Sequence, residues 1–475
     1  MKRFAALCYA ITAIAIHTTA FQPPPSLPRQ PAILRTSRNI KQSISSSRIK
    51  HQETLFIRQC SSTHNHHTNS DDQYQLEQKT WMFQDKYPIA YEVATTSTNN
   101  SDEEDVTTVP ILLLNGFGVG SFHQHRLMRQ LLLSQQQQQS DETKKRQQYV
   151  IYGIDYLGQG NSWPKDPQDG NSEDEYQLGY SADMWLQQLT GFVQEVVLSA
   201  DRMFTKVHLI GNSVGGYLAT YLTHTNPSLI STLTLLNATP VWGLNLPGWD
   251  GKLPAPTVPK VIGRQMFDLI RNEDIIRQYL EEAYYRVEAF DGTFVDGFDD
   301  WGGNNNNNRD GKVGEPLGVK IRACTEGNGG HAAFASILWS APASGVSFYE
   351  ALQQVPVDVL LLFGGDDPWC TEAVGKRMHV TLASRRNGNG AAAAACRFVT
   401  LKNVGHCPNH EAPTAVAQVL IPWLNADGSE ERRVVPLDSL REIQEPWGEV
   451  VIREISIEES ERLGLVDRVV SSMVG

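Results

Sequence analysis

Three residues far apart in the chain, a serine, an aspartate and a histidine, have the types that nucleophilic catalysis requires. The hydroxyl of Ser213 becomes a strong nucleophile when an imidazole takes its proton, and His406 could supply that imidazole. The imidazole in turn needs a carboxylate that fixes its tautomer and stabilises its charged form. Asp367 is the candidate and Asp366 its rival, and we favour Asp367 because a Pro-Trp pair follows it directly. Together the three residues predict acyl transfer through a serine-bound intermediate.

Ser213 lies where the sequence predicts a strand that turns sharply into a helix. Residues 206–210 form a mostly apolar run, and Gly-Asn-Ser-Val-Gly-Gly follows at 211–216. Glycines stand two residues before and two after the serine, where a sharp turn leaves no room for a larger side chain. The short motif also fits an ordinary strand-turn-helix junction, so the rest of the chain must supply the other parts of a site.

The other two candidates also follow apolar runs. The run at 357–363 leads to Asp367, and the run at 397–401 leads to His406. Strands that alternate with helices predict an α/β fold, a mostly parallel sheet with helices on both faces. The carboxyl ends of parallel strands meet at one edge of the sheet, so we expect the three residues to lie together there. Further apolar runs at 110–114, 149–155 and 229–236 support this pattern, and residues 185–196 have the spacing of apolar residues that is typical of a helix.

A glycine-rich loop at 116–120 follows the first of these runs and predicts an oxyanion hole. We expect the backbone N–H groups of Phe117 and Val214 to hold the negative oxygen of the reacting ester. Neither a metal nor a cofactor is implied by this chemistry. Four residues are weaker candidates for contact with the substrate, although aromatic side chains are mostly core residues. These four are Gly118, His123, Trp242 and Trp339.

Several other polar residues favour a structural role. Asp155 ends a strand before a glycine-rich turn, which is typical of a turn former, and His208 lies inside the strand before Ser213 and fits a core histidine. The chain has six cysteines without a Cys-x-x-Cys pair, so neither a disulfide framework nor a zinc site is expected. The glutamine run at 135–139 is expected to be a surface expansion.

The charge distribution separates the N-terminal segment from the rest of the chain. Residues 1–70 carry nine Lys or Arg and one acid, so residues 71–475 carry 32 basic and 52 acidic side chains. An acidic body argues against a nucleic-acid partner. Residues 1–20 have the basic start, apolar run and small residues of a signal peptide, and 21–70 have the Ser- and Arg-rich composition of a transit peptide. The alternative is simple secretion with a disordered tail.

The alternating pattern divides the remaining chain into four parts. Residues 71–240 and 347–425 are expected to form the α/β core. Between them, residues 241–346 lose the alternation, carry many aromatic side chains and predict a mainly helical cap. Residues 426–475 form a C-terminal extension of unknown role, with a strand expected at 450–452 and a helix at 457–473.

Six short strings in this chain are characteristic. The most specific are Leu-Asn-Ala-Thr-Pro-Val-Trp-Gly at 236–243 and Gly-His-Cys-Pro at 405–408. The others lie at 114–123, 211–217, 334–338 and 367–369. Together they resemble the pheophytinase and chlorophyll dephytylase family of plastid α/β-hydrolases. One departure concerns Asn115, where many α/β-hydrolases have His and pheophytinases tend to have Pro; the oxyanion donor is a backbone group in each case.

The resemblance implies a serine carboxylic-ester hydrolase that removes phytol from pheophytin or chlorophyll with Ser213, Asp367 and His406. The implied partner is an apolar phytyl-ester pigment, and peripheral contact with the thylakoid membrane and the oligomeric state stay open. A signal peptide followed by Phe21 and a transit-like segment resembles the presequences of diatoms and other algae with complex plastids, which implies a plastid protein reached through the secretory route. The alternatives are hydrolysis of another apolar ester or lipid and a non-catalytic pigment binder.

Overall fold

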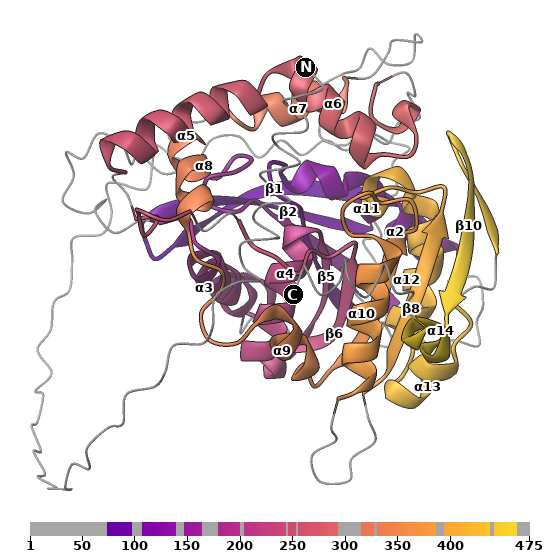
Figure 1. The fold of residues 1–475 in the computed structure, drawn as a ribbon. Coiled ribbons are helices and arrows are strands. Elements are labelled where there is room, and N and C mark those ends of the chain that lie inside the picture. The colour runs from indigo at the N-terminus through magenta and orange to yellow at the C-terminus, as the bar shows by residue number, and fades with distance from the viewer. Residues whose placement is uncertain are drawn as a thin grey trace, which may run out of the picture.

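The structure is a computed structural model, and Figure 1 shows its fold. It describes residues 74–96, 107–138, 147–163, 179–199, 204–243, 246–252, 255–292, 315–326, 330–385, 394–437 and 441–462. The predicted signal and transit segments, 1–20 and 21–70, lie outside the described residues. Within the described part, no helix has both the length and the apolar composition needed to cross a membrane.

Ten strands form one sheet in the order β1-β2-β4-β3-β5-β6-β7-β8-β10-β9. The six neighbours from β4 to β8 pair in parallel, and antiparallel strands flank them on both sides. The predicted α/β class and mostly parallel sheet are therefore confirmed. The strands are β1 (Tyr74–Phe83), β2 (Tyr87–Thr96), β3 (Thr107–Leu114), β4 (Gln147–Ile154), β5 (Val207–Asn212), β6 (Ile230–Leu236), β7 (Asp358–Gly364), β8 (Cys396–Lys402), β9 (Glu442–Glu445) and β10 (Gly448–Ile455).

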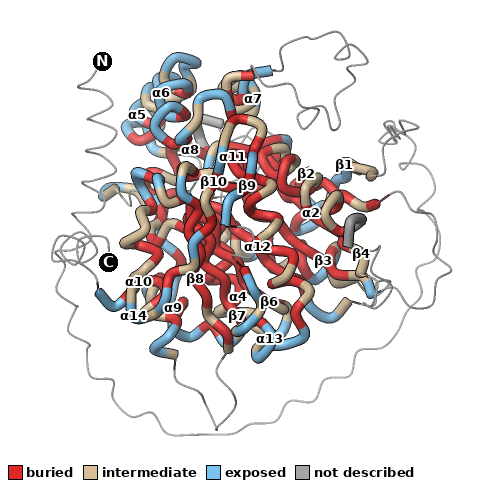
Figure 2. The backbone as a smooth tube through the Cα atoms, turned by 90° about the vertical axis from the view of Figure 1, so that its right-hand side faces the viewer, coloured by how far each residue is buried: buried red, intermediate tan, exposed pale blue. Residues whose placement is uncertain are grey.

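Helices cover both faces of the sheet, which explains why the central strands are continuous apolar runs. Every residue of β5 and β7 is buried. Alternate residues of the strands belong to two core clusters, one with α3, α4, α9 and α10, the other with α2 and α12. Figure 2 shows the buried residues concentrated in this layered centre. The helices of the core are α2 (His125–Gln138), α3 (Ala182–Phe192), α4 (Val214–Thr225), α9 (Phe348–Gln353), α10 (Glu372–Ala383), α11 (Pro408–Glu411) and α12 (Pro413–Asn425).

The described residues between β6 and β7 form helices and loops, in agreement with the expected helical character of 241–346. Figure 1 shows α5, α6 and α7 together at the top of the view. A small cluster that includes Leu280, Tyr284 and Leu317 packs α6 against α7, and Trp447 from the C-terminal region joins it. The helices are α5 (Thr257–Ile270), α6 (Glu273–Ala283), α7 (Leu317–Ala323) and α8 (Gly330–Trp339).

The C-terminal region continues the sheet. β10 pairs antiparallel with β8, so the strand expected at 450–452 is part of the main sheet. A buried ion pair of 3.0 Å joins Arg432 of α13 (Ser429–Val434) to Asp358 at the start of β7. The helix expected at 457–473 begins as α14 (Ile457–Glu461), and residues 463–475 lie outside the described residues.

The expected surface position of the glutamine run is wrong for its first residue, Gln135. Helix α2 continues to Gln138, and Gln135 is buried. The amide of Gln135 lies at the entrance of β4, where its Oε1 accepts a hydrogen bond from the backbone N–H of Tyr149 at 3.3 Å. Glutamine is a good helix former, so α2 continues into the run. The side-chain amide of Gln135 can also pair with backbone groups near the start of β4.

Candidate active site

Ser213 forms the sharp turn between β5 and α4. Its backbone has φ 54° and ψ −120°, a conformation that a residue with a side chain rarely adopts. The backbone before and after Ser213 is tightly packed, which holds the strained turn in place. A Cβ on Gly211 would lie only 2.4 Å from the carbonyl oxygen of Gly215. A Cβ on Gly215 would lie 2.5 Å from the carbonyl oxygen of Leu114. Both glycines are therefore required sterically, as the motif predicts.

Asp367 and His406 meet beyond the ends of β7 and β8. The Nδ1 of His406 lies 2.7 Å from Oδ2 of Asp367, and both side chains are buried. The backbone N–H of Trp369 donates to Oδ1 at 2.8 Å, and the amide of Asn237 donates to Oδ2 at 2.8 Å. Burial alone would raise the pKa of Asp367, but the charge of His406 and the hydrogen bonds from that imidazole and from the backbone N–H of Trp369 hold the pKa below its ordinary value.

The rival aspartate takes a different position. Asp366 is exposed, and its Oδ2 accepts a hydrogen bond from the backbone N–H of Asn403 at 2.7 Å. The structure therefore places Asp367, and not Asp366, against the imidazole of His406.

Asn212 links the serine turn to the histidine loop. Its Nδ2 donates to the carbonyl oxygen of His406 at 3.0 Å and to that of Leu236 at 3.1 Å. The backbone N–H of Ser213 donates to the same carbonyl oxygen of Leu236 at 3.0 Å. Ser213, Asp367 and His406 are thus gathered at the carboxyl edge of the parallel strands.

The loop after β3 lies beside the serine. A Cβ on Gly116 would be 3.5 Å from Cβ of Ser213. The backbone N–H of Gly118, at φ +80°, donates to Oε1 of Gln159 at 2.6 Å, so this N–H is already paired, while the residue itself is partly exposed. Among the described residues, the backbone N–H groups of Phe117 and Val214 have no acceptor. Two backbone N–H groups near the serine are therefore free to donate hydrogen bonds.

Asp155 forms hydrogen bonds that fix the end of the loop after β3. Its Oδ1 accepts the backbone N–H of Ser121 at 2.6 Å, and its Oδ2 accepts that of Asn161 at 2.8 Å. Burial raises the pKa of Asp155 to about 6. The expected role of this acid as a turn former is confirmed. His208 is likewise a core histidine, with Nδ1 2.8 Å from Oγ1 of Thr232.

His123 belongs to a buried polar network rather than to an open surface. It is 2% exposed, its Nε2 lies 2.9 Å from the hydroxyl of Tyr284, and its ring stacks on His410 with centroids 4.8 Å apart. Burial, together with the charges of Arg126 and His406, lowers the pKa of His123 to about 3. The network connects the segment after the oxyanion loop to the end of α6.

Trp242 and Trp339 are also buried, and each directs its indole N–H to a partner in the protein. Trp242 donates to Oγ of Ser340 at 3.0 Å and packs edge-on against Trp185. Trp339 donates to the carbonyl oxygen of Pro247 at 3.2 Å. Contact of either residue with a substrate stays a prediction.

Two residues that the sequence did not single out hold the site together. Asn237 orients Asp367, and Glu411 connects the histidine loop to the helical region. One carboxylate oxygen of Glu411 accepts the backbone N–H of Gly405 at 2.7 Å, and the other accepts that of Arg286 at 2.8 Å. Asn237 directly follows β6 at the same sheet edge, and that position was the one available signal.

One group of described residues has a spacing that a metal ion could use. The ligand atoms of Asp367, Cys370 and His406 all lie within 4.8 Å of one another. Asp367 and His406 are already bonded to each other, and burial raises the pKa of Cys370 well above its ordinary value. A protonated thiol is a poor ligand, so the group is better described as a hydrogen-bonded Asp–His pair with a neighbouring thiol.

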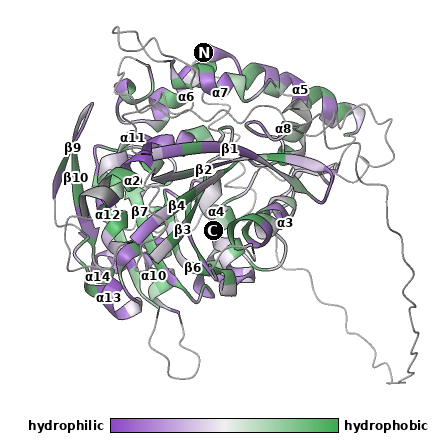
Figure 3. Ribbon diagram, turned by 180° about the vertical axis from the view of Figure 1, so that it is seen from behind, coloured by the Kyte–Doolittle hydropathy of each residue, from purple (hydrophilic) through white to green (hydrophobic). Residues whose placement is uncertain are grey.

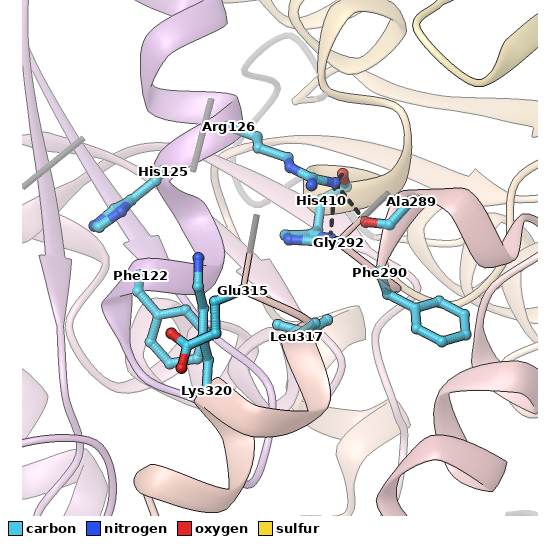
Figure 4. A pocket seen from close by; sticks show the side chains of 10 residues that line it. All are labelled: Phe122, His125, Arg126, Ala289, Phe290, Gly292, Glu315, Leu317, Lys320 and His410. Atoms are coloured by element: carbon cyan, nitrogen blue, oxygen red, sulfur yellow. Dashed lines mark hydrogen bonds between the residues drawn. The ribbon is translucent and has the colours of Figure 1, made fainter. Parts of the chain in front are cut away.

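A separate polar pocket lies between α2, α7 and the segment after α6. Figure 4 shows Arg126 among its lining residues, donating to the carbonyl oxygens of Ala289 at 2.7 Å and His410 at 3.0 Å. None of the three catalytic candidates lines this pocket. Its lining residues are Phe122, His125, Arg126, Ala289, Phe290, Gly292, Glu315, Leu317, Lys320 and His410.

Comparison with known proteins identifies the family to which this chain belongs. Residues 111–419 match the alpha/beta hydrolase family, and the chain belongs to that family. Within it, the chain is 30% identical over 370 residues to pheophytinase, chloroplastic, of Arabidopsis thaliana. That alignment covers 73% of this chain and 67% of the relative. The resemblance to pheophytinases that the sequence motifs indicate is therefore confirmed.

Solved structures with a similar fold include two esterases. The esterase EaEST from Exiguobacterium antarcticum is 16% identical and has a TM-score of 0.47, with 73% of this chain and 99% of that chain covered. A thermophilic esterase from Thermogutta terrifontis is 17% identical and has a TM-score of 0.44, with 73% and 98% covered.

Proposed function

We propose that this hydrolase is a serine carboxylic-ester hydrolase that removes phytol from pheophytin or chlorophyll. The observation that carries the proposal is the 2.7 Å contact between His406 and Asp367 at the sheet edge that also holds the strained Ser213. The relative named pheophytinase supports a phytyl ester as the substrate.

The proposed reaction proceeds through an acyl-enzyme. His406 takes the proton of the Ser213 hydroxyl as the oxygen attacks the ester carbonyl carbon, and Asp367 stabilises the resulting imidazolium. The N–H groups of Phe117 and Val214 hold the oxyanion. When the tetrahedral intermediate collapses, the bond to phytol breaks and His406 returns its proton to the alcohol oxygen. His406 then deprotonates a water whose oxygen attacks the acyl carbon. As the bond between this carbon and the Ser213 oxygen breaks, His406 returns the proton to that oxygen and the pigment acid is released.

The same proposal covers the setting of the reaction. Residues 241–346 act as a cap that shapes access to Ser213 and selects the ester. The protein works in a plastid, in the stroma or at the thylakoid, after delivery by the presequence at 1–70. The chloroplastic relative and the composition of that segment support this location.

Replacement of the nucleophile tests the function directly. The purified chain is incubated with pheophytin, with chlorophyll and with a short-chain ester, and free phytol or alcohol is measured. Ser213→Ala should lower the rate by about 10⁴-fold or more, while its circular dichroism matches that of the unmodified chain. Hydrolysis retained by Ser213→Ala would overturn the assignment of the nucleophile.

The three substrates also separate the alternatives. Turnover of the short-chain ester alone identifies an esterase for a different substrate. Binding of pigment without release of phytol identifies a non-catalytic pigment binder. Side-by-side rates with pheophytin and chlorophyll determine which of the two pigments is preferred.

A further inference from the structure

Large apolar side chains that are exposed gather on one part of this molecule. Of the twelve among the described residues, eight lie between Val258 and Val319, on the helices and loops of the cap. Two more, Phe117 and Trp369, lie on the loops beside Ser213 and His406. The other two of these twelve described residues, Met82 and Val434, lie elsewhere. Exposed apolar side chains that are concentrated in one region are typical of an interaction site.

Helix α5 contributes four of these side chains, and they share one face. Val258, Val261, Ile262 and Leu269 are exposed and spaced three, four or seven residues apart. The opposite face of α5 is buried against α8. A Cβ on Gly263 would lie 2.4 Å from Cβ of Ala335. The apolar exposed face is therefore additional to the face that packs α5 onto the protein.

The charges of α5 differ in sign from those of the surrounding chain. Residues 257–270 carry Lys260 and Arg264 against one acid, Asp268, which pairs with Arg271 at 3.1 Å, whereas residues 71–475 as a whole carry 32 basic and 52 acidic side chains. A basic helix with an exposed apolar face is typical of segments that lie in the interface of an anionic membrane. Figure 3 shows hydrophobic and hydrophilic segments side by side along α5.

Exposed aromatic rings connect this surface to the proposed catalytic centre. The rings of Tyr279 on α6 and Trp369 lie 6.4 Å apart, and the rings of Trp369 and His406 lie 5.0 Å apart. The backbone N–H of His406 also donates to the carbonyl oxygen of Ala283 at the end of α6 at 2.7 Å. A substrate that arrives at α5 and α6 would therefore meet an aromatic path to the imidazole.

We propose that the exposed face of α5 docks on the surface of a lipid bilayer that contains anionic lipids. Val258, Val261, Ile262 and Leu269 enter the interface, and Lys260 and Arg264 face the lipid head groups. This inference rests on the proposed function, because a phytyl ester is dissolved in the membrane and would reach Ser213 without crossing water. Docking through the cap presents the entrance of the site to the lipid phase.

Vesicle binding tests docking without requiring catalysis. The full chain is sedimented with phosphatidylcholine vesicles that either contain or lack phosphatidylglycerol. The double variant Val261→Glu, Ile262→Glu should bind the anionic vesicles about tenfold or more weakly, since two partly inserted aliphatic side chains are lost. The matched control is Val434→Glu, at a side chain that is 77% exposed on α13 at the opposite end of the molecule in Figure 1. It should bind as the unmodified chain does.

A second measurement separates docking from catalysis. The double variant should hydrolyse pigment embedded in vesicles about tenfold or more slowly, yet hydrolyse a water-soluble short-chain ester at the unmodified rate. Equal vesicle binding by the double variant and the unmodified chain would overturn docking through α5. Self-association of the unmodified chain without vesicles, abolished in the double variant, would overturn it in favour of a second copy. Failure of the proposed function looks different: vesicle binding persists, but detergent-dispersed pigment releases no phytol.

Discussion

Asn237 holds the carboxylate of Asp367 from a backbone position that few residues tolerate. Its φ is 39°, a region in which asparagine is more common than most other side chains. Its Nδ2 donates to Asp367, and its Oδ1 accepts the backbone N–H of Gly364 at 2.7 Å. One amide thus fixes the end of β7 and orients the acid that supports His406, so we regard it as a positioning residue.

Asn237→Asp should impair catalysis while preserving the fold. Aspartate tolerates the same backbone conformation, but it replaces the donor to Asp367 with a second carboxylate, and the repulsion raises the pKa of Asp367. We expect kcat to fall by about tenfold or more, about 1.4 kcal/mol of transition-state stabilisation, with a small change in KM. The acid limb of the pH–rate profile should move to higher pH. Asn226→Asp, at the far end of α4, is the matched control. An unchanged acid limb would contradict a role of Asn237 in holding Asp367.

At the scale of elements, the turn between β5 and α4 depends on close backbone contacts rather than on side chains. The strain at Ser213 persists because Gly215 lets the first turn of α4 approach the end of β3. This approach also brings the loop with Phe117 beside the serine.

Gly215→Ala should therefore destabilise the fold. Its Cβ would meet the carbonyl oxygens of Leu114 at 2.5 Å and Asn115 at 2.7 Å, and backbone atoms cannot rotate away. We expect a loss of about 2–3 kcal/mol in the free energy of unfolding by urea. Gly365→Ala is the control, because its Cβ would have only ordinary contacts, the nearest at 3.5 Å, and should change stability by less than about 0.5 kcal/mol. Equal losses in both variants would show that the contact at Gly215 is not special.

The elements that carry Ser213, Asp367 and His406 could be predicted from the sequence because the central strands are apolar at nearly every position. β7, for example, is buried throughout, and its sequence contains the continuous apolar run Val-Leu-Leu-Leu-Phe. A short apolar run of this kind, which ends in glycine, is typical of a buried strand. The contact between Asn237 and Asp367 could not be predicted, since the two residues are 130 positions apart and an asparagine after a strand also fits an ordinary turn. The contribution of Glu411 was likewise hidden, because it depends on how the helices before β7 approach the core.

At the scale of the whole molecule, buried histidines set a limit on acid stability. Burial and the charge of Arg432 lower the pKa of His208 to about 3, and burial lowers that of His379 to about 4. The pKa values of His123 and His410 are lowered for the same main reason. These rings stay neutral in the folded state while the unfolded chain takes up protons below its ordinary pKa. Stability contributed by each ring is therefore present above that pKa and is lost as the pH falls toward the folded value.

His208→Gln should reduce this pH dependence. Between about pH 7 and about pH 5 the unmodified chain should lose about 2 kcal/mol of unfolding free energy at this position, and the variant should not. The measurement is urea unfolding at both pH values, and the difference between them is compared, so any general effect of the substitution cancels. His224→Gln, at a partly exposed histidine of α4, serves as the control. The same decrease in His208→Gln as in the unmodified chain would contradict a neutral, buried His208.

The position of β10 has a consequence for how the chain reaches this fold. β8 ends at Lys402, but the strand that covers its edge begins only at Gly448, after α11, α12, α13 and β9. While the chain emerges from a ribosome or a translocation pore with its N-terminus first, the parallel strands can assemble before that cover exists. During that interval β8 presents unpaired N–H and C=O groups, which favour pairing with another chain. Completion of the sheet therefore waits for the release of residues 448–455, and until then the edge of β8 is open to other chains or to chaperones.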